Sequence, residues 1–384
     1  MRTTSQNRQS RLLTYLNIAQ ILRERIEEGK YCATEFLPAE RDLMVELSVS
    51  RQTIRQAIDV LKQEGIVVPE QGRGTRVVGS NNLTSIQNTT QFHLAALIIY
   101  GISRESSAEI CQGCASVMRS ANYHLIIAET MFQQQQRAAD EATHLTELLE
   151  KGIRGIIIYA EPTAQNHNLL LTAVKRGIHI VQIDRYMPDL PCDYVGVDNQ
   201  TAANDMVKHL LKSGHKRIAF LSINPEPSTC RERLAGYQKA LHDHCRLGFD
   251  DSLVQYLDVH KNLKTELERS VKYWLNLPEP PTAIFAVNDD LALLVIQALR
   301  FNNRKVPNDI AVVGFDNLRA ASFVSPSLTT IQQPFVDLGA TAAQLLLNRM
   351  TGSYEGEPKH ILLSTKLVVR ESCTKELERV LVPT

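Results

Sequence analysis

From His93 onward the chain repeats one pattern, in which a short apolar run is followed by a segment of helical length. Nine such runs lie at residues 94–100, 124–129, 155–160, 179–184, 193–198, 217–222, 254–259, 283–288 and 310–316. Continuous apolar strands that alternate with helices form parallel sheets covered by helices on both faces. Nine strands exceed one ordinary doubly wound sheet, so we expect a two-lobed α/β domain with a parallel sheet in each lobe.

Polar side chains stand at the carboxyl ends of these runs, which is where open α/β sheets bind their ligands. They include Tyr100, Glu161, Arg185, Asn288 and Asp316. Carboxylate, amide and guanidinium groups pair with neighbouring hydroxyls, so the pattern favours a polyhydroxylated small molecule in a cleft between the lobes. The alternative for any one such residue is a helix N-cap, because Asp198 and Asp289 also directly precede expected helices.

The N-terminal part carries a second pattern, two short amphipathic segments joined by a tight turn. In residues 51–63, an apolar stripe of helical period lies opposite Arg51, Gln52 and Arg55, and Ser50 stands at the N-cap position. Two helices joined in this way form a helix-turn-helix, whose second helix enters the major groove of DNA. Arginine matches guanine there and glutamine matches adenine. The alternative is a charged face that only contacts solvent.

A β-hairpin is expected directly after the second helix. Two β-rich runs, residues 66–68 and 75–78, flank a turn at residues 69–74 that contains Gly72 and Arg73. Such a hairpin is the wing of a winged helix, which makes the N-terminal domain α+β. From the tip of the wing, Arg73 can reach the minor groove or phosphates.

Net charge gives no separate support for nucleic-acid binding. The 384 residues include 42 Lys and Arg, 42 Asp and Glu, and 43% hydrophobic residues, which is ordinary for a globular protein. Residues 1–79 hold 12 basic against 10 acidic side chains, a surplus of two. The DNA prediction therefore rests on where the arginines point rather than on bulk charge.

Other patterns exclude several classes of protein. The seven cysteines show no tight disulfide spacing, and neither a secretory leader nor an apolar run of membrane-spanning length is evident, so we expect a cytoplasmic protein without a membrane anchor. Cys111 and Cys114, like His242 and His244, lack neighbours that would complete a ligand set, so we expect no metal. No glycine-rich dinucleotide turn follows the first strand and no nucleophile–base pair is evident, so we expect no cofactor and no enzymatic activity.

Residues 12–78 resemble the winged helix of the GntR regulator family, through the motifs PAERDL, VSRQTIRQAI, LKQEG and GRGTRVV in this order. The resemblance implies DNA contacts by Arg41, Arg51, Gln52, Thr53, Arg55 and Gly72. Together with Ser50 and Arg73, these residues are the predicted DNA-binding set.

Residues 93–372 are similar to the effector-binding domain of the LacI/GalR family, a relative of periplasmic sugar-binding proteins. Five motifs carry this likeness: DYVGVDNQTAANDMVKHLLKSGHKRIAFL, RERLAGYQKAL, AIFAVNDDLALLVIQAL, IAVVGFDN and PSLTTIQQP. The resemblance implies effector contacts by Arg233 and Asp316 and places Asn288 near the cleft. It also implies three crossings between the lobes, near Val195–Val197, Gln333–Phe335 and Gly356–Ile361.

These patterns divide the chain into a winged helix at residues 1–79, a linker at 80–92 and an effector-binding domain at 93–375. Lobe one is expected to take residues 93–195 and 335–356, and lobe two residues 197–333 and 361–372. A GntR-type DNA-binding domain joined to a LacI-type effector-binding domain resembles the arabinose repressors of Gram-positive bacteria. The hinge helix of ordinary LacI members has no counterpart in the linker sequence.

The combination predicts a sequence-specific transcriptional regulator, a repressor of carbohydrate-utilisation genes that a sugar releases from its operator. A homodimer would place two winged helices on a palindromic operator in double-stranded DNA. The alternative is a periplasmic-type solute-binding protein without a regulatory role, which the missing leader disfavours.

Overall fold

A computed structural model of the chain describes residues 15, 17–26, 28–32, 35–70, 73–78, 93–131, 134–224, 227–245 and 250–374. The chain divides into two compact units, Met1–Phe92 and His93–Thr384. The expected linker at residues 80–92 lies outside the described residues. In the described part of the chain, no helix is both long and apolar enough to cross a bilayer.

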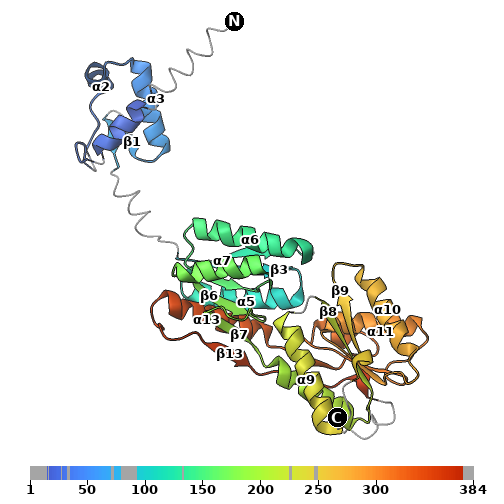
Figure 1. The fold of residues 1–384 in the computed structure, drawn as a ribbon. Coiled ribbons are helices and arrows are strands. Elements are labelled where there is room, and N and C mark those ends of the chain that lie inside the picture. Colours follow the sequence, from blue (N-terminus) through green and yellow to red (C-terminus); the bar gives the residue numbers. More distant parts are fainter. Residues whose placement is uncertain are drawn as a thin grey trace. The chain divides into compact units, whose positions relative to one another are not determined.

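The first unit is a winged helix, as its sequence predicts. Residues 17–26 are helical and are followed by α2 (Glu40–Leu47) and α3 (Arg51–Gln63), then by the antiparallel strands β1 (Val67–Glu70) and β2 (Gly74–Val77) (Figure 1). Each element contributes a buried apolar side chain to one core, which contains Leu22, Leu43, Ile54, Leu61, Val67 and Val77. This shared core fixes the two helices and the wing relative to one another.

The wing extends further than the sequence suggests. Pro69 and Glu70, expected in the turn, instead pair with Thr75 and Gly74 in the hairpin. Gly74 has φ +114°, a backbone conformation that favours glycine, so the chain can leave the turn at this point.

The second unit consists of two α/β lobes, and lobe one contains a parallel sheet of six strands. The sheet order is β13-β7-β6-β5-β3-β4. The bounds are β3 (His93–Tyr100), β4 (Tyr123–Thr130), β5 (Gly155–Ile158), β6 (His179–Ile183), β7 (Asp193–Val197) and β13 (His360–Leu363). Strands β5, β6 and β7 are almost wholly buried, which explains why their sequences consist of continuous apolar runs.

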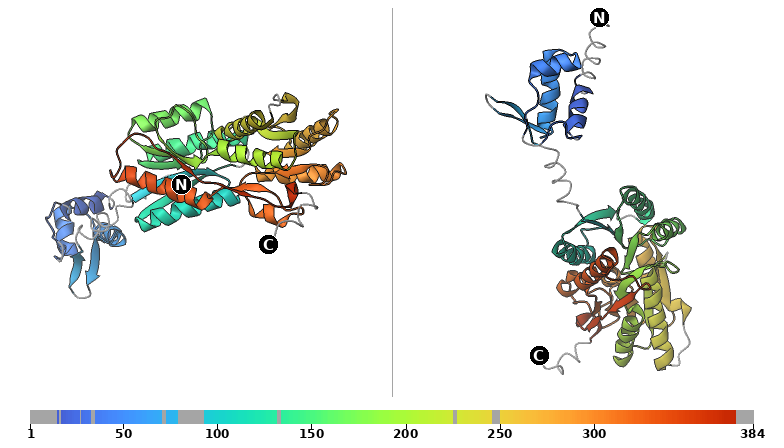
Figure 2. Two further views of the ribbon diagram at one scale, coloured as in Figure 1. Left: turned by 90° about the horizontal axis from the view of Figure 1, so that it is seen from below. Right: turned by 90° about the vertical axis from the view of Figure 1, so that its left-hand side faces the viewer.

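Helices cover both faces of this sheet (Figures 1 and 2). On one face, α5 (Glu105–Ser120) and α13 (Phe335–Met350) share a core with alternate residues of the strands. On the other face, α6 (Gln134–Glu150) and α7 (Ala164–Lys175) pack on the intervening residues. In β3, for example, Leu97 belongs to the first core and Ile98 to the second, as the two-residue period of a strand requires.

Two glycines let α5 and α13 approach closely. A Cβ atom at Gly113 would lie 2.0 Å from the Val336 carbonyl oxygen, and one at Gly339 would lie 2.1 Å from the Ile110 carbonyl oxygen. The Cys114 thiol lies buried in this contact and donates to the Gly339 carbonyl oxygen at 3.2 Å. Cys114 therefore packs between α5 and α13.

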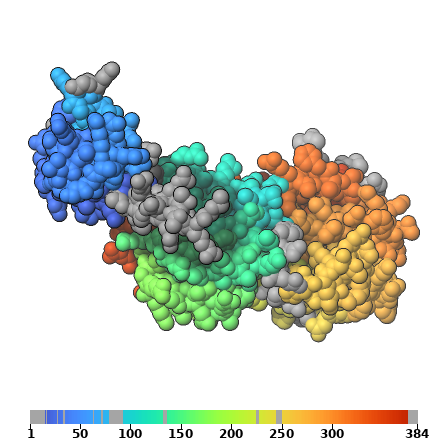
Figure 3. Space-filling model, turned by 90° about the horizontal axis from the view of Figure 1, so that it is seen from above, coloured from blue at the N-terminus to red at the C-terminus, as the bar shows by residue number. Residues whose placement is uncertain are grey.

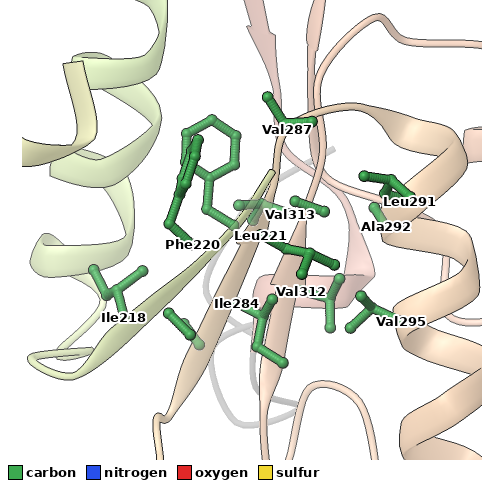
Figure 4. Packing of buried hydrophobic residues seen from close by; sticks show 14 of the residues in the cluster. Ile218, Phe220, Leu221, Ile284, Val287, Leu291, Ala292, Val295, Val312 and Val313 are labelled. Atoms are coloured by element: carbon green, nitrogen blue, oxygen red, sulfur yellow. The ribbon is translucent and has the colours of Figure 1, made fainter. Parts of the chain in front are cut away.

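Lobe two has a parallel sheet of four strands in the order β11-β10-β8-β9. Its elements are α8 (Asn199–Lys212), β8 (Ile218–Asn224), α9 (Ser228–Cys245), η1 (Asp251–Leu253), β9 (Val254–Asp258), α10 (Leu263–Leu275), β10 (Ala283–Ala286), α11 (Asp289–Phe301), β11 (Ala311–Val313), α12 (Arg319–Phe323) and η2 (Glu371–Cys373). Figure 4 shows Phe220, Ile284 and Val312 on the strands, with Leu291 and Val295 packing from the adjoining helix. These residues belong to one continuous buried core.

The chain crosses between the lobes three times, and one crossing differs from the expected place. It enters lobe two between β7 and α8 and returns between β12 (Thr330–Gln332) and α13, both where the sequence suggests. The third expected crossing, at Gly356–Ile361, is wrong because β13 pairs with β7 in lobe one. The chain leaves lobe one only after Leu363, and β14 (Lys366–Val368) then pairs with β12. In the space-filling view the two lobes lie side by side (Figure 3).

Candidate functional site

The helix α3 of the first unit presents a polar face. Ser50 caps it, since its hydroxyl accepts a hydrogen bond from the Thr53 backbone N–H at 3.2 Å. Apolar side chains of α3 are buried in the core of the winged helix, which leaves Arg51, Gln52 and Arg55 exposed on the other side. The helix therefore presents two guanidinium groups and one amide to a partner.

A single carboxylate holds the two arginines together. The Nε of Arg51 donates to Glu40 at 2.8 Å, and the Nε of Arg55 donates to the same carboxylate at 3.0 Å. The hydrogen bond from Arg51, with help from Arg55, lowers the pKa of Glu40. The arginine side chains remain 64% and 58% exposed, so their terminal nitrogens stay accessible to phosphate or base edges.

The other predicted DNA-binding residues divide into three groups. Arg41, in the first turn of α2, and Arg73, beside the wing strand β2, are exposed. Thr53 is half-buried, and its hydroxyl is hydrogen-bonded to Ser50 at 2.8 Å, so it belongs to the helix cap. Gly72 lies outside the described residues.

In the second unit, a cleft of about 830 Å³ lies at the carboxyl ends of the strands of both lobes. Five of the six predicted effector-binding residues line it, namely Tyr100, Arg185, Arg233, Asn288 and Asp316. The sequence pattern of polar strand ends therefore brings these side chains to one place, as parallel sheets require.

Glu161 is the sixth predicted residue, and the structure corrects its position. It is 3% exposed and does not line the cleft. Its carboxylate accepts hydrogen bonds from Arg185 and, at 2.8 Å, from Arg137. Glu161 therefore lies behind the wall of the cleft and holds two lining arginines, because a buried carboxylate must find cationic partners.

These arginines also lie against aromatic rings. The Arg137 guanidinium lies 4.3 Å from the ring centroid of Tyr100, and that of Arg185 lies 4.2 Å from the ring centroid of Tyr159. Burial, the largest single effect, lowers the pKa of Arg185, but the charges of Glu161, Tyr159 and Tyr100 and the hydrogen bond to Glu161 together outweigh it, so this pKa stays above its ordinary value. The lobe-one wall is therefore a rigid arrangement of charged and aromatic groups.

A second buried carboxyl supports this wall from behind. Glu141 accepts hydrogen bonds from the Glu161 backbone N–H at 2.8 Å and from the Asn166 amide at 2.8 Å. Burial raises the pKa of Glu141 to about 8. Glu141 thus fixes the backbone at Glu161, whose carboxylate faces the two arginines.

In the lobe-two wall, Arg233 is the central residue. It donates to the Asn199 side chain at 2.9 Å and to the Val287 carbonyl oxygen at 2.7 Å, and it lies 3.8 Å from Asp316. Its guanidinium lies 3.6 Å from the ring centroid of Phe315. Asp316 also accepts from Gln333 at 2.8 Å, so one network links the first and second crossing segments, through Asn199 and Gln333, to the cleft.

Asn288 and Asp289 have different roles from each other. Asn288 lines the cleft and also caps α11, accepting from the Leu291 N–H at 3.0 Å. Asp289 is not the cap that its position suggests. Its carboxyl is fully buried and accepts from Thr330 and from the Leu318 N–H. Burial raises the pKa of Asp289, and the nearby charge of Asp316 raises it further.

Four cleft residues are missing from the predicted set of effector-binding residues. They are Arg104, Arg137, Tyr159 and Gln333. Arg104 and Arg137 lie at the start of α5 and on α6, where a charged residue ordinarily indicates a solvated surface. Gln333 lies at an expected crossing, and that position was the one available hint.

Two residues that line the cleft each contain one polar atom that is fully buried. Among the described residues, the Nε of Arg185 and the Oε1 of Gln333 find no hydrogen-bond partner, although both side chains are about 95% buried. Buried polar groups are normally paired, because an unpaired one costs about 1–3 kcal/mol.

Comparison with known proteins places both units in one family. Residues 14–77 match the family "Bacterial regulatory proteins, gntR family", and residues 207–373 match "Periplasmic binding protein-like domain". The chain is 31% identical to the arabinose metabolism transcriptional repressor of Halalkalibacterium halodurans, over 93% of this chain and 96% of that protein. The chain belongs to this family of transcriptional repressors, which carry a GntR-type DNA-binding domain.

Other similar proteins match a smaller share of this chain. The HTH-type transcriptional repressor CytR of Escherichia coli is 30% identical, over 69% of this chain and 74% of CytR. The solved complex of the transcriptional regulator CelR with cellobiose has the same fold, with a TM-score of 0.64 and 24% identity, over 84% of this chain and 91% of that chain. The family membership confirms the expected function as a transcriptional repressor.

Proposed function

We propose that this repressor holds a double-stranded operator through its winged helix and releases it when an uncharged carbohydrate occupies the cleft between its lobes. The observation that carries the proposal is that one chain joins an exposed arginine-bearing recognition helix to a polar cleft of ligand size. Such a protein acts on chromosomal DNA, in the cytoplasm.

In the DNA-binding unit, Arg51, Gln52 and Arg55 would read base edges in the major groove, since their exposed side chains share one face of α3. Arg41 and Arg73 would contact phosphates, which set register without reading sequence. Ser50 and Thr53 would act at the helix N-terminus, where backbone N–H groups also favour phosphate. Gly72 remains a predicted contact of the wing.

A homodimer would present two such helices to a palindromic operator, with half-sites about 34–36 Å apart or a multiple of this distance. A twofold axis is the commonest symmetry of soluble oligomers and matches the symmetry of such an operator. Dimerisation is therefore part of the proposal.

The charges in the cleft favour an uncharged ligand over a sugar phosphate. Each lining guanidinium already has a carboxylate beside it: Arg104 pairs with Asp290, Arg233 lies near Asp316, and Arg137 and Arg185 share Glu161. Neighbouring sugar hydroxyls can both donate to carboxylates and accept from guanidinium groups without adding net charge. We therefore expect Tyr100, Arg185, Arg233, Asn288 and Asp316 to contact the sugar.

Release requires that the sugar bind one arrangement of the lobes better than another. The coupling free energy equals the difference between its affinities for the two states, typically about 1–3 kcal/mol. Asn199 lies at the first crossing and Gln333 at the second, and these residues contact Arg233 and Asp316 of the cleft. Ligand contacts with Arg233 and Asp316 would therefore act on two of the segments that join the lobes.

Operator binding in the presence of sugars tests this proposal. The full chain would select its operator from a random duplex library, and fluorescence anisotropy would then measure the Kd with pentoses, hexoses, disaccharides and their phosphates. We expect one class of neutral sugar to weaken operator binding at least about tenfold, which is about 1.4 kcal/mol of coupling. An unchanged Kd with every sugar would contradict the proposal.

A further inference from the structure

The composition of the cleft wall changes along the sheet of lobe two. The strand order is β11-β10-β8-β9, and the carboxyl end of each strand meets the cleft. Asp316 follows β11 and Asn288 follows β10, so the first half of the sheet edge is polar. Ile223, the last but one residue of β8, and Val259, which follows β9, both line the cleft, so the second half of this edge contributes apolar side chains.

Leucines from the neighbouring helices extend the apolar half. Leu263 begins α10 and packs beside β9, while Leu291, Leu293 and Leu294 lie in the first turns of α11. Leu263, Leu293 and Leu294 are only partly buried although they contact the core of lobe two. The same segments also contribute polar lining residues, namely Thr229 and Arg233 on α9, His260 after β9 and Asp290 on α11.

The cleft is also too large for one sugar ring. Its volume of about 830 Å³ is in the upper part of the range for ligand sites, roughly 300–1,000 Å³. The lobes are already in contact across the cleft, since Arg104 pairs with Asp290 and Tyr186 donates to Glu232 at 2.9 Å. The volume therefore does not come from lobes that stand fully apart.

We propose that the effector is a glycoside with an apolar aglycone, whose sugar contacts the polar half of the cleft and whose aglycone lies on the leucines of the apolar half. This inference rests on the proposed carbohydrate function and specifies its ligand class. A free monosaccharide would leave Leu263 and Leu294 in contact with water. Covering such side chains with an aromatic ring removes apolar surface from water on both partners, which strengthens binding roughly 10- to 100-fold.

Paired glycosides test the inference by isothermal titration calorimetry on the full chain. The probes are the methyl and phenyl glycosides of glucose, galactose, xylose and arabinose in both anomers, with cellobiose and maltose as polar compounds of similar length. We expect a phenyl glycoside to bind roughly 10- to 100-fold more tightly than its methyl partner, with a more negative heat-capacity change. A disaccharide that binds more tightly than every phenyl glycoside would overturn the inference.

Variants of the apolar half locate the effect. In Leu263→Gln and Leu294→Gln, we expect the phenyl advantage to fall at least about tenfold while methyl glycoside affinity stays within about threefold. Leu277→Gln is the matched control, since Leu277 is a partly buried leucine of the same lobe outside the cleft. A phenyl advantage that survives in both variants would place the aglycone elsewhere and overturn the inference.

The outcomes separate this inference from the proposed function. If simple sugars or methyl glycosides bind and release the operator but phenyl glycosides gain nothing, the inference fails and the proposed function stands. If no probe binds and none changes operator affinity, both fail.

Discussion

Replacing Arg233 with lysine tests whether this side chain is the main effector contact of lobe two. Arginine donates to both the Asn199 side chain and the Val287 carbonyl oxygen, from two nitrogens of one planar group. A lysine ammonium keeps the charge beside Asp316 but cannot reach both acceptors and a ligand with fixed geometry. The variant therefore removes the planar pair of donor nitrogens while retaining the positive charge.

The expected loss follows from these contacts. A hydrogen bond that involves a charged group contributes about 1.5–3 kcal/mol, so losing one such bond to the effector weakens binding roughly 10- to 100-fold. Leaving the Asn199 or Val287 oxygen unsatisfied costs a further 1–3 kcal/mol or so of folding stability. Lysine is preferable to alanine because removing the whole cation would leave Asp316 without its ion-pair partner.

Isothermal titration calorimetry with the effector, and operator binding with and without it, measure the two consequences. We expect the variant to bind the operator normally and to need roughly 10- to 100-fold more effector for release. Arg217→Lys is the matched control, since Arg217 pairs with Asp250 outside the cleft of the same lobe. Effector affinity within about threefold of the original protein would show that Arg233 is not a contact and would refute this reasoning.

Two further predictions concern the recognition helix and the wall behind the cleft. Arg51→Ala and Arg55→Ala should each weaken operator binding. Removing an arginine that contacts a phosphate should also lower the slope of log K against log salt concentration by about 0.9. Removing an arginine that contacts a base edge should cost about 1–3 kcal/mol of binding free energy and leave this slope nearly unchanged. Lys62→Ala, at the far end of α3, is the control. Normal operator binding by both arginine variants would contradict the assignment of Arg51 and Arg55 to the DNA-binding face. Because burial raises the pKa of Glu141 to about 8 from an unfolded value near 4.3, its contribution to stability is full below about pH 4 and is lost as the pH rises through about 8. Urea unfolding at pH 6 and pH 8.5 should therefore show a fall in stability that is smaller in Glu141→Gln; equal falls in the two proteins would argue that Glu141 is already ionised at neutral pH.

Local patterns were sufficient to predict most of the fold. The apolar runs of β5 and β10 are buried on both faces and predict parallel strands wherever they pair. The stripe on α3, its Ser50 cap and the glycine-bearing wing likewise depend on residues close in sequence. Five of the predicted effector residues met in one cleft because the carboxyl ends of parallel strands must share an edge.

The features that the sequence did not predict depend on which strands pair and on how deeply a side chain is buried. Nothing in His360–Leu363 tells which sheet it joins, so its pairing with β7 corrected the third crossing. Glu161 and Tyr100 are both polar strand ends, yet only the tertiary structure places Glu161 behind the wall. Arg137 reaches the cleft from α6 because Glu161 and Tyr100 hold its side chain there.

The sequence by itself therefore determined the helices and strands, the face that each of them buries and the sheet edge at which the predicted ligand binds. It could do so because short-range periodicity fixes which face of each element is buried. The tertiary structure alone decided which polar groups reach the ligand and which support them, and where the wall turns from polar to apolar. Those properties depend on strand order and on side chains from distant segments, which the period of a single segment does not encode.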